Sequence, residues 1–307
     1  MIVCCGEALI DMLPRPLAEG GDGFRPVPGG AVFNTAIGLG RLGVPAQFFS
    51  ALSTDMFGEL LVDALAQSDV ATDLCPRKVQ PTTLAFVKLV DGQATYSFFD
   101  ENSAGRSLAV TDLPILERNV SALHFGAISL IPEPCGTAFE TLMARNTDKV
   151  LSLDPNIRPG FIQDADAHRT RLLRMIAMAD IVKVSDEDLD WLAEGAPHDV
   201  TIKHWLDGGT SIVLLTAGKD GATAYTQSGS VHQNVVAVDV VDTVGAGDTF
   251  NAGLLSSLLE QDCLTKPALK SIRDKALSAA LQRAVLVAGV TVSRAGANPP
   301  WMAELDG

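Results

Sequence analysis

Short apolar runs alternate with longer segments in which apolar residues recur every three or four positions. The short runs predict buried strands, and the helical spacing predicts amphipathic helices. The predicted strands cover 2–5, 47–52, 84–90, 94–99, 122–125, 150–153, 181–184, 212–215 and 222–226. The predicted helices cover 32–42, 57–66, 135–145, 166–178, 186–194, 199–207 and a segment that begins near residue 247. We therefore expect an α/β fold with a doubly wound, mainly parallel sheet flanked by helices, in a single domain over residues 1–307.

Two regions interrupt this alternation. Residues 14–28 are rich in proline and glycine and predict an exposed flap or loop after the apolar residues 9–13. The runs 84–90 and 94–99 are separated by Asp91-Gly92-Gln93, and Asp-Gly between β-rich runs is typical of a hairpin. Together, residues 9–28 and 84–100 predict a small β-sheet lid outside the main sheet.

Charge and cysteine usage narrow the class of protein. The formal net charge of -14 disfavours nucleic acid or an anionic membrane as a partner, although local N–H groups and cations can still bind ATP. The five cysteines form no C-x-x-C pair, which fits reduced thiols. The N-terminus lacks the pattern of a signal peptide, and no uninterrupted apolar run approaches the roughly 20 residues that span a membrane. We expect a soluble, cytoplasmic protein.

The segment 241–250 carries the most specific chemistry. Gly245 and Gly247 lie where a loop enters an apolar periodic segment, so Gly245, Ala246 and Gly247 open a helix. Unpaired N–H groups and the positive end of the helix dipole favour a bound phosphate there. Asp248 would compete with an anion unless it orients an attacking hydroxyl and accepts its proton. On this segment alone, an Asp that merely caps the helix is an equally good interpretation.

A second glycine pair, Gly29-Gly30, precedes the predicted helix that ends at Gly43. Asn34 falls in the first turn of that helix and can both donate and accept hydrogen bonds. By itself the segment predicts only a packing helix. Asp11, between apolar neighbours, is either a solvated strand residue or an acceptor for two sugar hydroxyls at the mouth of a site.

Polar residues follow three predicted parallel strands, and ligands of doubly wound sheets bind beyond these carboxyl ends. The segments are 154–158, 183–188 and 216–221. Other chemistries lack their motifs, since the chain has no G-x-x-x-x-G-K-[ST], G-x-S-x-G or H-E-x-x-H. The five histidines are scattered without metal-ligand spacing. A phosphate site at this edge of the sheet is the prediction that remains.

Residues 28–43 and 242–250 resemble the N-terminal and C-terminal motifs of the ribokinase-like family of sugar kinases, in the expected order and separation. The resemblance implies that Asp248 is the catalytic base and that the N–H groups of Gly245, Ala246 and Gly247 form an anion hole. It assigns further residues to the two substrates and the metal. The sugar side comprises Asp11, Gly29, Gly30, Asn34, Phe98 and Arg158, with Arg158 reaching the γ-phosphate. The nucleotide side comprises Lys183, Ser185, Thr216, Gly218, Gly221, Gly247 and Val285, with ATP covered by residues 284–297.

Two positions depart from the family pattern. Many relatives have Asn-x-x-Glu near the Mg²⁺-phosphate site, where this chain has Ser185-Asp186-Glu187-Asp188, so Asp188 is the candidate for water-coordinated Mg²⁺. Val285 lies where relatives often carry Asn or His near the adenine. The resemblance also implies a homodimer that pairs through the lid, and it allows a monovalent cation such as K⁺ near Asp242.

Within the family, the segments 96–106 and 154–160 resemble bacterial fructokinases most. The predicted reaction is transfer of the γ-phosphate of ATP to D-fructose, giving fructose 6-phosphate. A 2-keto-3-deoxygluconate kinase, a ribokinase and a nucleoside kinase are alternatives within the family. A non-catalytic sugar or nucleotide sensor on the same fold is the alternative from another class, and the presence of Asp248 disfavours it.

Overall fold

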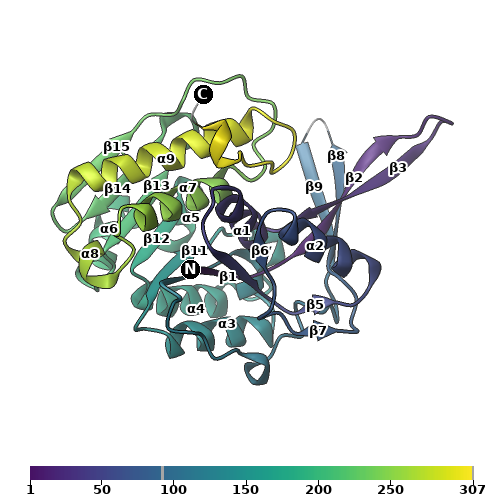
Figure 1. Cartoon of the computed structure of the whole chain (residues 1–307), viewed down its shortest axis with the longest axis horizontal. Helices are drawn as coiled ribbons and strands as arrows, with labels where there is room; N and C mark the ends of the chain where they lie inside the picture. Colours follow the sequence, from purple (N-terminus) through teal and green to yellow (C-terminus); the bar gives the residue numbers. More distant parts are fainter. Residues whose placement is uncertain (91–92, 306–307) are drawn as a thin grey trace.

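A large sheet with helices on both faces and a smaller sheet beside it organise the computed structural model, which describes residues 1–90 and 93–305 (Figure 1). The large sheet within these ranges has nine strands, of which seven are mutually parallel and the last two at one edge pair antiparallel. Their spatial order is β15 (Gly229–Gln233), β14 (Ala222–Thr226), β13 (Ile212–Thr216), β12 (Ile181–Ser185), β11 (Val150–Asp154), β10 (Ala122–Gly126), β1 (Ile2–Cys5), β4 (Ala46–Phe49) and β6 (Val70–Ala71). The predicted doubly wound, mainly parallel sheet is confirmed.

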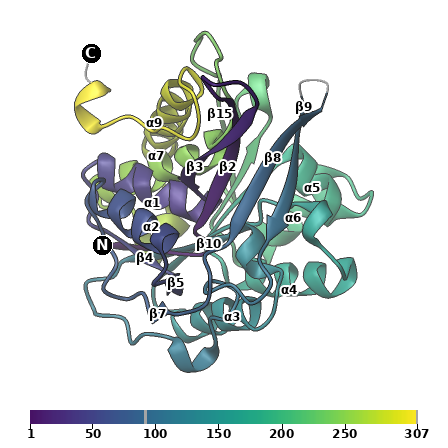
Figure 2. The same ribbon diagram turned by 90° about the vertical axis from the view of Figure 1, so that its right-hand side faces the viewer.

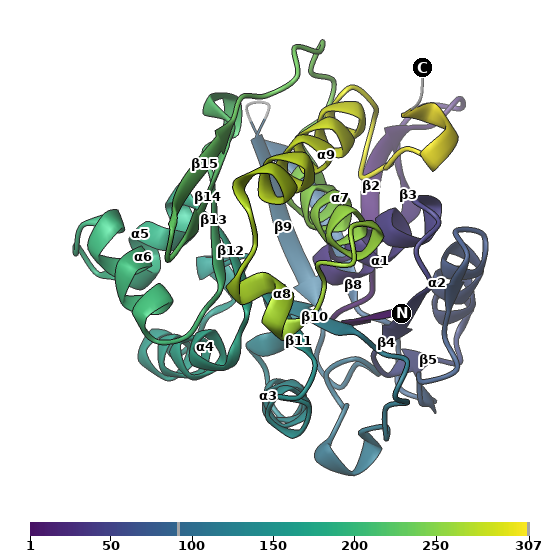
Figure 3. The ribbon, with the colours of Figure 1, turned by 60° about the vertical axis from the view of Figure 1, so that its left-hand side comes forward.

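Both faces of this sheet are buried, because successive side chains of each strand point to opposite sides. In β1, Ile2 and Cys4 join one apolar cluster, and Val3 and Cys5 join the other. The first face carries α1 (Ala31–Arg41), α2 (Met56–Ala66), α7 (Ala246–Glu260), α8 (Lys266–Lys270) and α9 (Asp274–Val292). The second face carries α3 (Cys135–Arg145), α4 (Ala165–Met178), α5 (Asp186–Ala193) and α6 (His198–Asp207), and Figure 3 shows the two helical layers.

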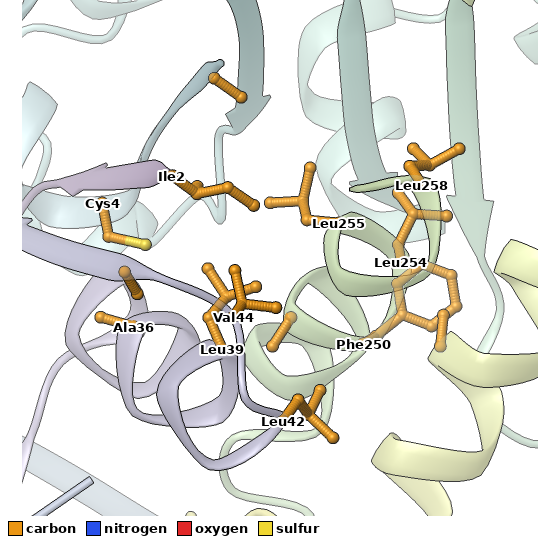
Figure 4. Close-up of a cluster of buried hydrophobic side chains, with 14 of the residues drawn as sticks. Ile2, Cys4, Ala36, Leu39, Leu42, Val44, Phe250, Leu254, Leu255 and Leu258 are labelled. Atoms are coloured by element: carbon orange, nitrogen blue, oxygen red, sulfur yellow. The ribbon is translucent and has the colours of Figure 1, made fainter. Parts of the chain in front are cut away.

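Helices α1 and α7 pack side by side at the centre of the first face. Leu39 of α1 and Leu254 of α7 lie in the cluster that Figure 4 shows, together with Ile2 of the underlying strand. Gly38 lets the two helices approach closely because it has no side chain. A Cβ atom added there would lie only 2.7 Å from the Cβ of Ala252. The contact brings the N-termini of two helices that are far apart in the sequence to the same edge of the sheet.

The smaller sheet has the order β3 (Asp22–Gly29), β2 (Leu9–Pro16), β8 (Leu84–Val90) and β9 (Gln93–Phe99). It projects from the main body in Figure 1, and its strands lie side by side in Figure 2. The expected loop over 14–28 is wrong, because most of that segment forms the paired strands β2 and β3. Proline is tolerated in this place. Strand β3 lies at the edge of the sheet, and β8 pairs with β2 only at Ile10–Met12, before Pro14 and Pro16. The predicted hairpin turn at Asp91 and Gly92 lies outside the described residues.

Smaller differences concern short strands. The predicted strand 47–52 is divided into β4 and β5 (Leu52–Ser53), and β5 pairs with β7 (Arg77–Lys78) instead of with the large sheet. Strand β15 was not expected, since its sequence, Gly-Ser-Val-His-Gln, has little apolar pattern. Short 3-10 helices occupy Val110–Asp112, Ala127–Leu130, Pro159–Phe161, Gly218–Asp220 and Met302–Glu304.

Helix α9 is, within residues 1–90 and 93–305, the one helix long and apolar enough to cross a membrane. It packs on α7 and on strands β14 and β15, and residues such as Leu277, Leu281 and Val287 are buried there. A core helix passes the same test of length and composition, so the criterion is weak evidence for a membrane span.

Candidate active site

The N-terminus of α7 forms the floor of the candidate site. The helix follows Gly245, whose φ of +79° is a left-handed conformation, and no side chain caps it. A Cβ at Gly245 would also lie 2.5 Å from the Cβ of Ala297. The N–H of Ala246 donates to the carbonyl of Thr243 at 3.3 Å, a long bond that leaves the group near the cavity. Glycine is thus required for this turn, and an anion can approach the helix end closely.

Asp248 lies in the first turn of α7 and is buried. Its Oδ2 accepts a hydrogen bond from Asn34 Nδ2 at 2.9 Å, and its Oδ1 lies 3.5 Å from Asn156 Nδ2. Burial raises the pKa of Asp248 to about 7, the hydrogen bond from Asn34 opposes the rise, and the neighbouring Asp154 adds to it. Such a carboxylate can exchange a proton near neutral pH, as a general base must.

A buried ionic cluster lies beneath Asp248. Lys183 Nζ is 3.0 Å from Asp154 Oδ2, which also accepts a hydrogen bond from Asn251 Nδ2 at 2.7 Å. Burial lowers the pKa of Lys183, but the carboxylates around it, Asp154 first, raise it overall. A Cβ at Gly247 would lie 2.9 Å from Lys183 Nζ, so this ammonium group lies against the first turn of α7. Its positive charge therefore adds to that of the helix end.

One cavity of about 610 Å³ joins most of the residues that the sequence predicts. From the sugar set and the catalytic set it is lined by Asp11, Gly30, Asn34, Phe98, Arg158, Gly245, Ala246, Gly247 and Asp248. From the nucleotide and metal set it is lined by Lys183, Ser185, Asp188, Thr216 and Gly218. Gly29 lies directly beside Asp11. The two residues are so close that a Cβ atom added to Gly29 would collide with Asp11 Oδ2.

The side of this cavity that is predicted to bind the sugar combines acidic, basic and aromatic groups. Burial raises the pKa of Asp11 to about 6. Phe98 stacks edge-on against Phe161 at 4.0 Å between ring centroids. Arg158 donates from NH1 to the carbonyl of Ile157 at 3.0 Å and lines the cavity with its side chain. The wall can thus meet both hydroxyl groups and an apolar face of a ligand.

A second cavity of about 580 Å³ adjoins the first one and is mostly apolar. Thr216, Gly218 and Gly247 line both cavities, whereas Gly221 and Val285 line only the second. Valine side chains dominate its wall, namely those of Val235, Val236, Val238, Val240, Val285 and Val292. A flat apolar ring would fit here with its attached charged groups directed toward α7.

Asp188 is held by local hydrogen bonds at the start of α5. Its Oδ1 accepts from Ile157 N at 2.9 Å and its Oδ2 from Ser185 N at 3.3 Å, while Ser185 Oγ accepts from Asp188 N. Burial raises the pKa of Asp188, and the nearby Asp154 adds to the rise. Within the part of the chain that the structure describes, no group of three His, Cys, Asp or Glu side chains could hold a metal ion. Any metal here would need most of its ligands from bound phosphates and water.

Sequence reasoning missed several polar residues of the site. Glu7 lines the cavity and follows β1, where the rule of polar residues after parallel strands would have found it. Asp154 and Asn156 lie in a segment that this rule did single out, but no role was predicted for either. Asn251 has no such signal, since it lies inside α7 and only the fold brings it to Asp154.

Comparison with known proteins identifies similar chains. The model of the pfkB family carbohydrate kinases matches residues 1–304. A fructokinase of Rhizobium leguminosarum bv. trifolii is 54% identical over 278 residues, which cover 90% of this chain and 85% of that protein. The structure of a fructokinase from Xylella fastidiosa with bound ATP has a TM-score of 0.91 at 30% identity and covers 99% of this chain and 96% of that one. A fructokinase from Vibrio cholerae O395 with bound fructose, ADP and calcium ion has a TM-score of 0.82 at 25% identity and covers 99% and 95%.

Proposed function

The chain belongs to the pfkB family of carbohydrate kinases, and from this premise we propose that it transfers the γ-phosphate of ATP to D-fructose, forming fructose 6-phosphate. The family makes it a sugar kinase. The choice of fructose rests on the similarity to fructokinases, above all on the relative that is 54% identical. The observation that carries the chemistry is the buried Asp248 carboxylate at the N-terminus of α7, with open cavity on both sides of that turn.

Asp248 acts as the general base in this proposal. Phosphoryl transfer has a loose transition state, so the protein mainly aligns the hydroxyl and stabilises charge on the transferred group. Asn34 fixes the orientation of the carboxylate by its bond to Oδ2 at 2.9 Å, and Oδ1, which has only the longer 3.5 Å bond from Asn156 Nδ2, receives the proton of the sugar hydroxyl. The N–H groups of Gly245, Ala246 and Gly247 would hold the phosphoryl oxygens, and Lys183 behind Gly247 adds positive charge.

The two substrates approach this turn from opposite sides. Asp11, Gly29, Gly30 and Asn34 would bind the sugar hydroxyls, with Phe98 against the apolar face of the ring and Arg158 toward the γ-phosphate. The valine-lined cavity would take the adenine, beside Thr216, Gly218, Gly221 and Val285. Its apolar wall favours stacking over hydrogen bonds to the base. Lys183 and Ser185 would face the phosphates.

Magnesium fits the chemistry of the acidic edge formed by Asp186, Glu187 and Asp188, since their oxygen donors are those that Mg²⁺ prefers. The Oδ1 atom of Asp154, buried and without a hydrogen-bond partner among the described residues, is a further acceptor close by. Asp188 would hold the ion through water. When bound, Mg²⁺ neutralises charge on the β- and γ-phosphates.

A monovalent cation such as K⁺ would bind near Asp242. Both oxygens of that carboxylate already accept backbone hydrogen bonds, from Val244 N at 3.0 Å and from Gly296 N at 2.9 Å. The carboxylate thus joins the loop before α7 to the turn after α9. A cation there would brace the anion hole from behind, and an activity titration with KCl against choline chloride tests for it.

The small sheet would serve as a lid and as a dimer interface. Phe24, Phe86 and Phe99 form a continuous aromatic row across its strands, with centroid distances of 5.0 Å and 5.4 Å. Phe24 is 49% exposed and Phe99 is 61% exposed, which is unusual for phenylalanine unless another surface covers it. We propose that two copies pair through this row, and light scattering of the purified protein measures the resulting mass.

As an enzyme that consumes ATP, the protein would work in the cytoplasm.

The decisive experiment measures ADP release from MgATP with purified protein and a panel of fructose, glucose, ribose, 2-keto-3-deoxygluconate and adenosine, with a blank lacking sugar. We expect selective turnover with fructose. Turnover with another member of the panel would keep the mechanism and discard the substrate. A folded protein that binds ATP and is silent with every sugar would overturn the proposed function.

A further inference from the structure

Glu7 connects the first strand of the large sheet to the first turn of α1. It follows β1 directly after Gly6, at the carboxyl edge where the site lies. Its Oε1 accepts hydrogen bonds from the N–H groups of Ala31 at 2.7 Å and Val32 at 3.4 Å. The residue before α1, Gly30, provides no side-chain cap, so the carboxylate of Glu7 replaces the missing N-cap from 24 residues away.

The backbone of Glu7 holds the same turn from below. Gly30 has φ of +116°, and a Cβ there would lie 2.8 Å from the carbonyl oxygen of Glu7 and 3.2 Å from its Cγ. The turn before α1 therefore rests on Glu7 with no room for a side chain. Any change that moves Glu7 would move the start of the helix.

The first turn of α1 in turn clamps Asp248. Asn34 Nδ2 donates to Asp248 Oδ2 at 2.9 Å, and Thr35 Oγ1 donates to the Asp248 backbone carbonyl at 3.0 Å. Thr35 Oγ1 also lies 3.2 Å from the carbonyl of Ala31, the residue whose N–H Glu7 holds. The first turn of α1 thus joins Glu7, which holds its N–H groups, to Asn34 and Thr35, which hold the side chain and the backbone of Asp248.

The second oxygen of Glu7 is costly where it is. Oε2 is buried and has no hydrogen bond of good geometry within the described residues, although the backbone N–H of Ser129 acts on this carboxylate. Burial raises the pKa of Glu7, and backbone N–H groups around it, including those of Ala31 and Val32, oppose the rise. An unsatisfied buried acceptor destabilises a fold, and a glycine turn capped by Asn or Ser would avoid it. Such costs are typical of functional sites.

We propose that Glu7 is a positioning residue for catalysis: by capping α1 from the end of β1, it holds Asn34 and Thr35 where they orient the Asp248 carboxylate toward the sugar hydroxyl. The inference rests on the proposed function of Asp248 as the base. It predicts that Glu7 affects kcat through Asp248 and the KM for fructose through Gly30 and Asn34, whereas the KM for ATP stays unchanged, because the clamp acts on the start of α1 and not on the valine-lined cavity.

The test compares Glu7→Ala with Glu7→Gln. The glutamine amide can turn its oxygen or its NH₂ group toward Ala31 N–H, and only the oxygen accepts a hydrogen bond from that donor. The cap is therefore kept, and we expect kcat within about threefold of the wild type. The alanine removes the cap, and kcat should fall on the order of tenfold or more, because misorientation of a reacting group has costs of this size. The KM for fructose should rise as well, since Gly30 and Asn34 move too, whereas the KM for ATP should change little. Equal loss of kcat in both variants would overturn the proposal.

A double-mutant cycle separates positioning from a merely structural role. In an Asp248→Asn background Glu7→Ala should cost no further kcat, because the base that it orients is already gone. The matched control is Asp164→Ala, which removes the carboxylate cap of α4 at Ala167 N (2.9 Å) on the other face of the sheet. It should lower the melting temperature without lowering kcat. Additive losses in the cycle, or a control that lowers kcat as much as Glu7→Ala, would refute the positioning role.

Hydrogen exchange tests the clamp without any substrate. Amide exchange over residues 31–35 should be faster in Glu7→Ala than in the wild type and unchanged in Glu7→Gln. Unchanged exchange in Glu7→Ala would overturn the proposal even if the enzyme phosphorylates fructose. Conversely, faster exchange in a protein that phosphorylates no sugar would support the clamp and count against the proposed function alone.

Discussion

Replacing Asp248 by asparagine tests the chemistry most directly. The amide oxygen can take the place of Oδ2 at 2.9 Å from Asn34 Nδ2, so the side chain keeps its size and its anchor. The amide cannot accept the proton of the sugar hydroxyl. Since a positioned general base contributes about 10²–10⁴ in rate, the change removes about 2.7–5.5 kcal/mol of transition-state stabilisation. We expect kcat to fall by about 10² or more while fructose binding is retained.

The assay has three parts. Coupled ADP release at saturating MgATP and fructose gives kcat, and titration calorimetry gives the affinity for the sugar. Asp63→Asn, the same change at an exposed position of α2, is the matched control and should leave both quantities unaltered. Since burial places the pKa of Asp248 at about 7, kcat/KM of the wild type should rise with pH through that value and then level off. Turnover of Asp248→Asn within a few fold of the wild type would refute the assignment of the base.

Asp248→Asn should also change the pH dependence of the protein's stability. The pKa of Asp248 is raised from its ordinary value near 4 to about 7 by burial, so the fold favours the protonated form. The buried, protonated carboxyl group therefore adds to the free energy of unfolding at low pH, and this stabilisation is lost as pH rises through about 7. Asp248→Asn should therefore melt above the wild type at pH 8, by a few degrees, with a smaller difference at pH 5. Melting temperatures that are equal at pH 8, or that diverge toward acid, would contradict the origin given for the raised pKa.

Three further predictions follow from contacts in the structure. Burial raises the pKa of Asp11 to about 6, so KM for fructose should fall as pH rises through that value, and Asp11→Asn should show no such step. Gly245→Ala should lower kcat by about 10² because it distorts the left-handed turn of the anion hole, whereas Gly160→Ala, in open space, should leave kcat unchanged. Lys266→Met breaks the ion pair with the buried Asp180 and should lower the free energy of unfolding by about 1–3 kcal/mol without altering kcat, as measured by urea titration.

The sequence predicts those features of the fold and the site that a local pattern of residues encodes. Strand and helix alternation predicts the large sheet, and two long motifs predict the family, because apolar spacing and glycine turns are local properties. The smaller sheet over residues 9–28 and 84–100 agrees with the prediction, but the loop expected over 14–28 does not, since proline usually breaks a strand and only the edge position of β3 and the short pairing of β8 allow it here. The partnership of Asn251 with Asp154, 97 residues apart, depends on packing that no local pattern encodes.

The separation of Asn34 and Asp248 has a consequence for biosynthesis. Their hydrogen bond closes a loop of 214 residues, so the Asp248 carboxylate is oriented only after α7 has left the ribosome. At about 5–20 residues per second, roughly 10–40 seconds pass between the emergence of the two helices. During that time the apolar face of α1, with Ala36 and Leu39, is not covered by α7. A circularly permuted chain that begins in the loop before α7 would place α1 after α9 and β1 to β3, closer to α7 along the chain than in the natural order. It would shorten this interval, and pulse-chase proteolysis during translation would show α1 becoming protected sooner after its synthesis.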